Sequence, residues 1–267
     1  FAIEKGFYDP KSGNQFRFSD AYNPANDRIK KGCAMRVWSL LRRSAPSLHL
    51  SSDYARGVAN ARRYPLGVTP DHKLSTADVF SLLRDHYEGT AFDMTKGDYA
   101  GAFGSPYQKR TERSISIRGT VFSIVTQSRA SLPDPIGGVL WYSPDDTYFS
   151  CYTPFYCGIH AVPEAYAVCD RKKFSWDSAW WTFNFVDNYA NLKYAKMKKD
   201  IQAVQKSMES NYLTLQPVIE KTAVDFYETD PKLMMQYLTN YSVSGAEQVL
   251  KRWHRLADKL IVKYNDR

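Results

Sequence analysis

The chain has 267 residues, of which 43% are hydrophobic and 24% are charged. This balance excludes a disordered chain, and the length allows one large domain or two small ones. The formal net charge is +8, yet no helix-turn-helix, zinc-finger or single-strand-binding signature accompanies it. The basic residues follow helical spacing, so solvated helix faces explain them better than a binding stripe does. We therefore expect no nucleic-acid partner.

Other function classes also lack their sequence signatures. No apolar run approaches the length of a membrane span, so we expect no membrane partner. The HExxH, GxGxxG and phosphate-loop motifs are missing, and the cysteines form no CxxC pair. Buried small thiols explain these cysteines better than a metal site does, and we expect no cofactor and no metal. The four cysteines are Cys33, Cys151, Cys157 and Cys169.

Two of the helices predicted before the first strand have clear sequence signals. The spacing of apolar residues predicts a helix over residues 27–43. Ser75 and Asp78 are close to a capping box, which predicts a second helix that ends near His86. His86 could act as a general base, but a structural histidine at a helix end is the better explanation.

Three strands are predicted within residues 112–160. Residues 114–126 alternate and are β-branched, residues 138–142 are short and apolar, and residues 147–152 are aromatic. Four turn-forming residues, 143–146, separate the last two strands, which predicts a hairpin.

The first predicted strand carries an arginine in its middle. Ile115 and Ile117 fall on one face, and Arg118 falls on the other. A charged side chain in the middle of a sheet is usually paired or exposed. Arg118 could bind a carboxylate or an oxyanion with two parallel hydrogen bonds, or it could be a solvated or structurally paired residue. The pattern alone favours the structural interpretation.

The last third of the chain is predicted to be helical. Ser175 is expected to cap a long helix with a buried seam. Asp230-Pro231 begins another helix, and Ser244 with Glu247 forms a capping box that begins the last one. The seam consists of Ala190, Tyr194, Met197, Ile201, Val204 and Met208.

Five long blocks of the sequence occur in the order of one known family. They are RRYPLGVTPDHKLSTADVFSLLRDHYEGTAFDMT, ERSISIRGT, IGGVLWYSPDD, TPFYCGIHAVPEAY and FSWDSAWWTFNFV. Over about residues 1–211 the chain resembles the cysteine dipeptidases of the dipeptidase A and dipeptidase D type. The resemblance implies an α+β fold that is part of a four-layer αββα N-terminal-nucleophile hydrolase sandwich. Residues 1–170 would then hold the strands of the sandwich, and residues 171–267 would form a helical region packed on it.

The resemblance also implies a peptidase that hydrolyses dipeptides. The family's nucleophile is a cysteine that begins the mature chain, whereas this chain begins with Phe1. We therefore expect the nucleophile in an upstream segment of the same protein, and no catalytic residue in this chain. Related hydrolases support the nucleophile with a strand arginine, which would correspond to Arg118 or Arg113. Trp141 and Asp93 are further candidates for binding the dipeptide.

Several alternatives stay open. Acylases of the same superfamily act on non-peptide amides, and a non-catalytic binding module could keep the fold without the nucleophile. An internal nucleophile would be Cys151 or Cys157 with His160 as its base, although proximity in sequence is weak evidence for such a pair. The partners expected are the dipeptide, the upstream segment and, if it assembles, a second copy. The sequence leaves the localisation open between the cytoplasm and export from a bacterial cell.

Overall fold

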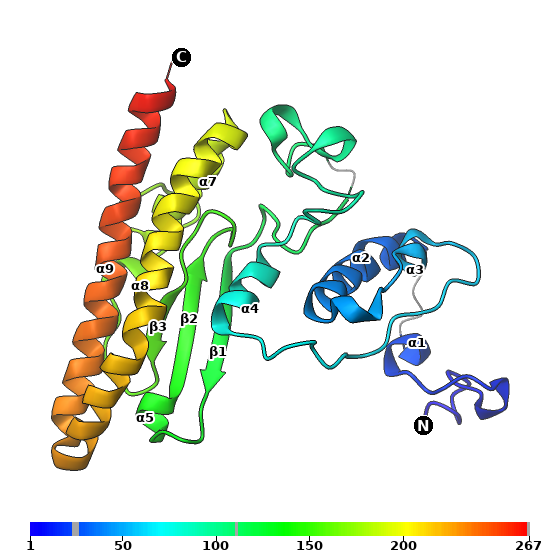
Figure 1. Ribbon diagram of the computed structural model, residues 1–267, viewed down its shortest axis with the longest axis horizontal. Helices are drawn as coiled ribbons and strands as arrows, with labels where there is room; N and C mark the ends of the chain where they lie inside the picture. The colour runs from blue at the N-terminus through cyan, green and yellow to red at the C-terminus, as the bar shows by residue number, and fades with distance from the viewer. Residues whose placement is uncertain (23–26, 110–111, 266–267) are drawn as a thin grey trace. The chain divides into compact units, whose positions relative to one another are not determined.

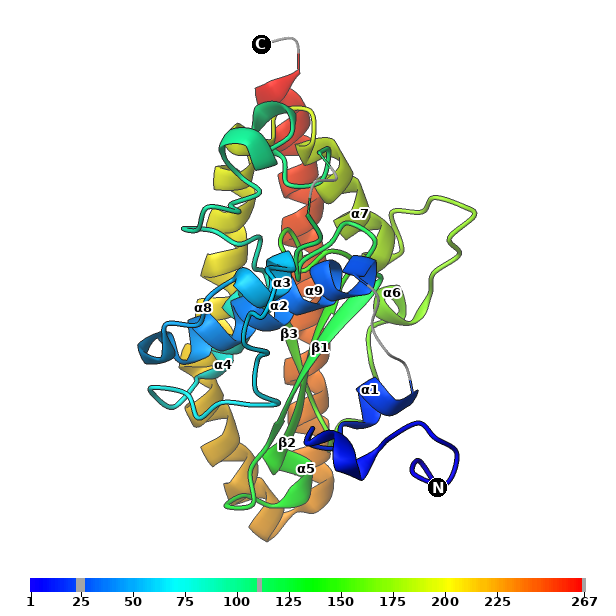
Figure 2. The same ribbon diagram turned by 90° about the vertical axis from the view of Figure 1, so that its right-hand side faces the viewer.

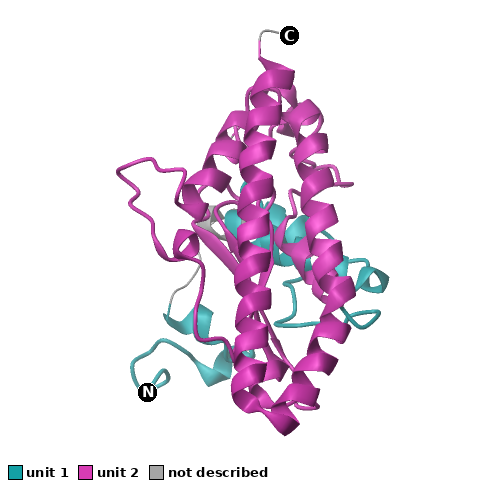
Figure 3. Ribbon diagram, turned by 90° about the vertical axis from the view of Figure 1, so that its left-hand side faces the viewer, with its two compact units in different colours: residues 1–74, 112–114 teal, residues 75–111, 115–267 magenta. Residues whose placement is uncertain are grey.

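The computed structural model describes residues 1–22, 27–109 and 112–265 (Figure 1). It divides into two compact units (Figure 3). Unit 1 contains residues 1–74 and 112–114, and unit 2 contains residues 75–111 and 115–267. This grouping differs from a division at residue 170, because the sheet and the C-terminal helices fall in the same unit.

Unit 1 is helical in its described residues. Its longest helix is α2 (Asp27–Ser44), which confirms the helix predicted over residues 27–43. Trp38 is buried on α2, and its Nε1 donates to the carbonyl of Leu50 at 2.8 Å, which holds the following segment against the helix. The shorter elements are η1 (Pro10–Ser12), α1 (Phe18–Tyr22), η2 (Pro46–Leu48) and α3 (Asp53–Arg56).

Unit 2 is built around a three-stranded antiparallel sheet in the order β1-β2-β3. The strands are β1 (Phe122–Ser128), β2 (Gly138–Pro144) and β3 (Thr153–Tyr156). Phe122 of β1 pairs with Pro144 of β2, and the short helix α5 (Asp134–Gly137) precedes β2. Together with the helices, this sheet gives the mixed α+β content that the sequence predicts.

The predicted strands differ from the observed ones in their limits. Strand β2 contains the predicted residues 138–142. Strand β1 begins only at Phe122, because residues 114–121 form coil and a turn in which Thr120 N donates to Ile117 O at 3.0 Å. The long alternation of apolar residues therefore predicts a strand that is too long at its N-terminal end.

The strand predicted over residues 147–152 is wrong. The side chain of Asp146 accepts a hydrogen bond from Tyr148 N at 2.8 Å, and its carbonyl accepts one from Ser150 N at 3.1 Å. These two bonds fold the segment into turns, since a short polar side chain competes with a ladder for backbone donors. The strand forms after the turns, as β3.

The first helix of unit 2 is α4 (Thr76–Leu83). Ser75 Oγ accepts from Asp78 N at 3.2 Å, and Asp78 Oδ2 accepts from Ser75 N at 2.8 Å, so the predicted capping box is confirmed. The helix ends three residues before His86. The turns η3 (Gly97–Tyr99) and η4 (Ala102–Gly104) follow it.

Three helices complete unit 2 after the small helix α6 (Glu164–Ala167). They are α7 (Ala179–Ala190), α8 (Tyr194–Thr229) and α9 (Pro231–Tyr264), and the last two run side by side along the sheet (Figure 2). Asp230 caps α9, as predicted, by accepting from Lys232 N at 3.0 Å. The predicted helix start at Ser244 is wrong, because buried residues continue at helical spacing on both sides of it.

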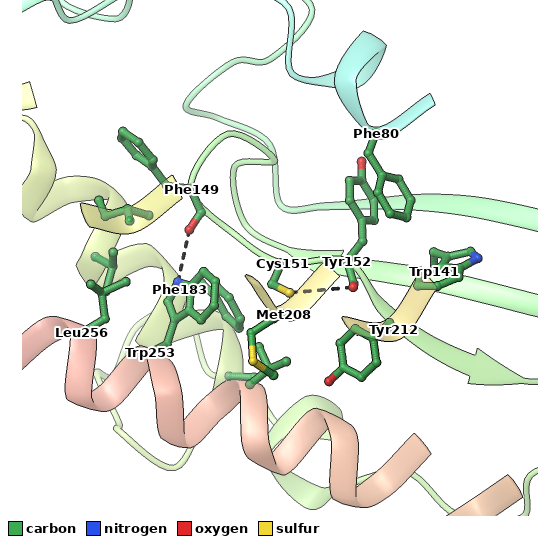
Figure 4. Packing of buried hydrophobic residues seen from close by; sticks show 14 of the residues in the cluster. Phe80, Trp141, Phe149, Cys151, Tyr152, Phe183, Met208, Tyr212, Trp253 and Leu256 are labelled. Carbon is green, nitrogen blue, oxygen red and sulfur yellow. Dashed lines mark hydrogen bonds between the residues drawn. The ribbon is translucent and has the colours of Figure 1, made fainter. Parts of the chain in front are cut away.

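The core of unit 2 lies between the sheet and these helices. Trp141 and Trp253 are fully buried in it, and Trp253 Nε1 donates to the carbonyl of Phe149 at 3.1 Å (Figure 4). The predicted seam is present, since Met197 and Ile201 are completely buried. The seam passes from the end of α7 into α8, two separate helices where the sequence predicts one.

Candidate functional site

One face of α7 presents polar side chains to the turn after β2. Asn184, Asp187 and Asn188 share this face because they are three and four residues apart. Asn184 Nδ2 donates to Asp145 Oδ1 at 3.1 Å, and Asn188 Nδ2 donates to the carbonyl of Asn184 at 2.8 Å. Asp187 is buried and Asn188 is exposed, so the face runs from the interior to the surface.

The turn after β2 begins with a strained residue. Asp145 has φ of +62°, in the left-handed region, and its backbone nitrogen donates to Val121 O at 2.8 Å. This conformation costs a non-glycine residue of the order of 1 kcal/mol or more, and such strain concentrates at functional sites. Asp145 is also 1% exposed, and the next residue, Asp146, is completely buried.

Only one of the two side-chain oxygens of Asp146 has partners. Oδ1 accepts from Ser116 Oγ at 2.6 Å and from Tyr148 N at 2.8 Å. Oδ2 is buried with no hydrogen-bond partner within the described parts of the chain. The carboxyl group is thus fixed in place with one acceptor left over.

Asp145, Asp146 and Asp187 form a buried group that we call the aspartate cluster. The pKa of Asp145 is raised to about 7, mainly by burial; the hydrogen bond from Asn184 opposes this rise, and the nearby charge of Asp146 adds to it. Burial likewise raises the pKa of Asp187 well above its ordinary value, with added repulsion from Asp146 and Asp145. Asp145 and Asp187 therefore lose their protons less readily than ordinary aspartates do.

Arg118 lies at the exposed end of the same face of α7. Its guanidinium donates to Asn188 Oδ1. Its positive charge acts on Asp145 and Asp187 and opposes the rise of both pKa values. The structure thus brings Arg118 to a group of carboxyls, from a turn instead of from the middle of a strand.

Two tyrosines border the cluster. Tyr194 is 1% exposed, and its hydroxyl has no hydrogen-bond partner in the part of the chain that the structure describes. Burial raises the pKa of Tyr194, and Tyr148, Asp146 and Asp187 add to this rise, which places the hydroxyl near the cluster. The second tyrosine is Tyr107, whose pKa is raised by burial and by Asp146.

His86 is linked to this region through Tyr107. His86 Nε2 and Tyr107 Oη are 2.9 Å apart, and His86 Nδ1 lies 3.3 Å from Glu88 Oε1. The imidazole is completely buried between these two partners. This arrangement agrees with a structural histidine, and it also connects the partly exposed Glu88 to Tyr107.

The other predicted site residues have different surroundings. Arg113 is exposed and belongs to unit 1. Trp141 is fully buried, with its ring 5.4 Å from that of Phe80 and its Nε1 donating to Gln127 Oε1 at 3.3 Å. Asp93 accepts from Thr95 N at 2.9 Å and shapes its own loop. The role of these three residues in substrate binding stays a prediction.

The sequence alone does not indicate the aspartate cluster. Asp145 and Asp146 belong to the predicted turn over residues 143–146, and Asp187 lies within the long helix predicted after Ser175. The available signal is the group Asn184, Asp187 and Asn188, since three polar residues at helical spacing in an apolar helix need a buried partner.

Cys151 does not have the surroundings of an activated nucleophile. Cys151 is completely buried, and burial, with the nearby charge of Glu209, raises the pKa of its thiol well above the usual value (Figure 4). A reactive cysteine requires the opposite shift. His160 Nδ1 lies 3.0 Å from Thr239 Oγ1, so its ring is engaged by α9. Cys33, Cys157 and Cys169 are exposed free thiols.

The described residues offer neither a metal site nor a membrane-spanning helix. Within residues 1–22, 27–109 and 112–265, no group of three or more His, Cys, Asp or Glu side chains could hold a metal ion. None of the helices described here combines the length and the apolar character that a membrane crossing requires.

The chain is similar to proteins named as dipeptidases. It is 33% identical over 159 residues to a probable dipeptidase of Salmonella dublin, covering 60% of this chain and 33% of the relative. It is 24% identical over 220 residues to a probable dipeptidase A of Streptococcus pyogenes serotype M1, covering 80% and 43%. A dipeptidase A of Lactobacillus helveticus is 31% identical over 121 residues, covering 45% and 24%.

The match with these relatives covers only part of their length. The chain spans less than half of each of the three. The model of peptidase family C69 matches residues 1–207, which include Arg118 and the whole aspartate cluster. Because this match covers most of the chain, the chain belongs to peptidase family C69.

Proposed function

We propose that this chain is part of a dipeptidase whose nucleophile is a cysteine in a segment before Phe1. The observation that carries the proposal is the family match over residues 1–207, together with relatives that are named dipeptidases. The burial of Cys151, which raises the pKa of its thiol well above the usual value, also supports a nucleophile elsewhere, since a reactive cysteine requires the opposite shift.

The proposed chemistry needs only protein groups. A cysteine at the start of a chain uses its own α-amine, with a pKa of about 8, as the base that takes the thiol proton. The thiolate attacks the peptide carbonyl, and hydrogen-bond donors hold the developing negative charge. Arg118 is the donor that this chain would supply, because a guanidinium has five N–H groups and its bond to Asn188 uses only part of them.

The exposure of β1 agrees with a further part of the sandwich that the upstream segment would supply. β1 lies at the edge of the sheet, and Phe122 and Ile124 are 53% and 48% exposed. Apolar edges of this kind pair readily with further strands. In the proposed four-layer αββα sandwich, strands of the upstream segment would cover this part of the sheet.

The assay compares the isolated chain with the longer protein. The longer protein should release free amino acids from dipeptides, and replacing its N-terminal cysteine with alanine should abolish the release. Residues 1–267 alone should release none, with or without added zinc or manganese. Robust hydrolysis by residues 1–267, lost in Cys151→Ala or Cys157→Ala, would overturn the proposal and assign the nucleophile to this chain.

The same assay separates the acylase alternative. Acylated amino acids that carry no peptide bond serve as the second substrate class. Faster hydrolysis of these amides than of dipeptides would contradict the dipeptidase proposal and favour an acylase. Hydrolysis of neither class by the longer protein would favour a binding module.

A further inference from the structure

The aspartate cluster has more acceptors than the protein satisfies. Asp145 Oδ2, Asp146 Oδ2 and both side-chain oxygens of Asp187 are buried, and none of them has a hydrogen-bond partner in the residues that the structure describes. Leaving a buried acceptor unpaired costs about 1–3 kcal/mol, and more when it is charged. A fold keeps such a group when something outside it supplies the missing donors.

Protonation does not by itself pair the oxygens of this cluster. It gives each carboxyl group one O–H donor that needs an acceptor in turn, and both side-chain oxygens of Asp187 are buried without a hydrogen-bond partner among the described residues. Arg118 does not fill the gap, because its recorded hydrogen bond goes to Asn188. With all three acids ionised and Arg118 charged, the group would carry a net charge of −2.

A buried hydroxyl points to a ligand independently of the acids. Tyr194 comes from α8, whereas the aspartates come from the β2 turn and from α7. Its hydroxyl is also buried and unpartnered within the described residues, and it lies close enough to Asp146 and Asp187 for their charges to act on it. Three separate elements of unit 2 thus leave polar atoms unsatisfied in one place.

We propose that the aspartate cluster binds the α-ammonium group of the dipeptide substrate. The inference rests on the proposed function and adds the part of the substrate that this chain recognises. An ammonium group has three N–H donors and one positive charge, which suits several unpaired carboxylate oxygens in a buried site. The Tyr194 hydroxyl adds a further acceptor.

The exposure of the neighbouring residues provides an approach to the cluster. Arg118 and Asn188 are exposed and Asn184 is half-buried, whereas Asp187 and Asp146 lie beneath them. An amine would therefore enter past polar groups and end against buried acids. The cluster would therefore favour substrates with a free α-amine, because an acylated nitrogen has neither the positive charge nor the three N–H donors.

The test measures amine binding separately from hydrolysis, on the longer protein. The probes are alaninamide, which has a free α-amine, and N-acetylalaninamide, which does not. Wild-type protein should bind alaninamide more tightly, and Asp187→Asn should weaken alaninamide binding by about tenfold or more, the value of one charge-assisted hydrogen bond. Asp225→Asn removes an exposed acid on α8 and should leave both affinities unchanged.

Stability and kinetics complete the test. Asp187→Asn should unfold at or above the wild-type temperature, because it removes a buried acid with no recorded partner. If that variant fails to fold, Asp145→Asn replaces it, since asparagine tolerates a positive φ. In the assay of the longer protein, the variant should raise KM for dipeptides more than it lowers kcat.

Two outcomes would overturn the inference. The first is equal alaninamide affinity in the wild type and in Asp187→Asn. The second is a fall in kcat with KM unchanged, which would assign the acids to the enzyme's own α-amine instead of the substrate's. Absence of dipeptide hydrolysis by the wild type would overturn the proposed function instead, and the alaninamide affinities would still decide whether the cluster binds an ammonium group.

Discussion

Ser116 donates a 2.6 Å hydrogen bond to Asp146, and this bond joins the coil before β1 to the turn after β2. Both residues are buried, at 1% and 0% exposure. Thr147 Oγ1 lies 3.1 Å from the same Ser116 hydroxyl and donates to Leu83 O, at the end of α4, at 3.0 Å. The serine is therefore the junction that fixes one carboxyl of the aspartate cluster.

Ser116→Ala should destabilise the protein by about 1–3 kcal/mol, because it removes a donor to a buried carboxylate. For a domain of this size, that corresponds to a fall in Tm of about 2–4 °C per kcal/mol, measurable by calorimetry. Ser210→Ala is the matched control, since Ser210 is exposed on α8. A Tm equal to that of Ser210→Ala would mean that the Ser116 bond contributes nothing to the fold.

Ile201→Ala tests the core between α8 and the rest of unit 2. Ile201 is completely buried, and truncating such a residue costs about 2–5 kcal/mol. The free energy of unfolding from urea titration should fall accordingly. Val218→Ala, at a position on the same helix that is 62% exposed, should change it by less than about 0.5 kcal/mol. A fall in Tm below about one degree for Ile201→Ala would contradict the packing described here.

The helices were more predictable than the strands, for a physical reason. The seam through Met197 and Ile201 and the cap at Ser75 depend on residues a few positions apart, so a short stretch of sequence is enough to predict them. The strand limits depend on pairing between distant residues. Asp146 lies two residues after the end of β2, and its side chain accepts a hydrogen bond from Tyr148 N that folds the next segment, which no alternation of apolar residues reveals.

The candidate site also has one part that the sequence indicates and one part that it does not. Arg118 was a candidate from its sequence context, because a charged residue beside isoleucines needs an explanation. Asp187 was not, because its meaning comes from Asp145 and Asp146, about forty residues away in the sequence. Such a cluster exists only once α7 packs beside the β2 turn, so tertiary structure is required to find it.

The pKa of Asp145 predicts how stability changes with pH. The folded-state pKa is raised to about 7, whereas an unfolded aspartate has a pKa of about 3.9. Between these values the folded state holds the proton and the unfolded state does not. Stability from this group is therefore fully present below about pH 4 and is lost as the pH rises through about 7, by at most about 1.4 kcal/mol per pH unit.

Asp145→Asn should remove this loss. The free energy of unfolding of the variant relative to the wild type should increase between about pH 5 and about pH 7, as measured by urea titration at each pH. The remaining charged groups near Asp145 are Asp146, Asp187 and Arg118, and Asp187 acts in the same direction because its pKa is also raised. A difference that stays constant with pH would show that Asp145 is ionised throughout this range.

Arg118→Lys tests the site directly, in the longer protein. Lysine keeps the positive charge but loses the planar guanidinium that binds Asn188 and that could hold a second acceptor. Because Arg118 is exposed, Tm should change little, whereas kcat/KM for dipeptides should fall by about tenfold or more. Arg252→Lys, at an exposed position on α9, is the control for a conservative change at a surface arginine and should alter neither quantity.

Arg113→Lys provides the comparison that assigns the role, since both arginines fit the position implied by the family. Loss of activity in Arg113→Lys alone would transfer the role to Arg113, and full activity in both variants would eliminate a catalytic arginine from this chain.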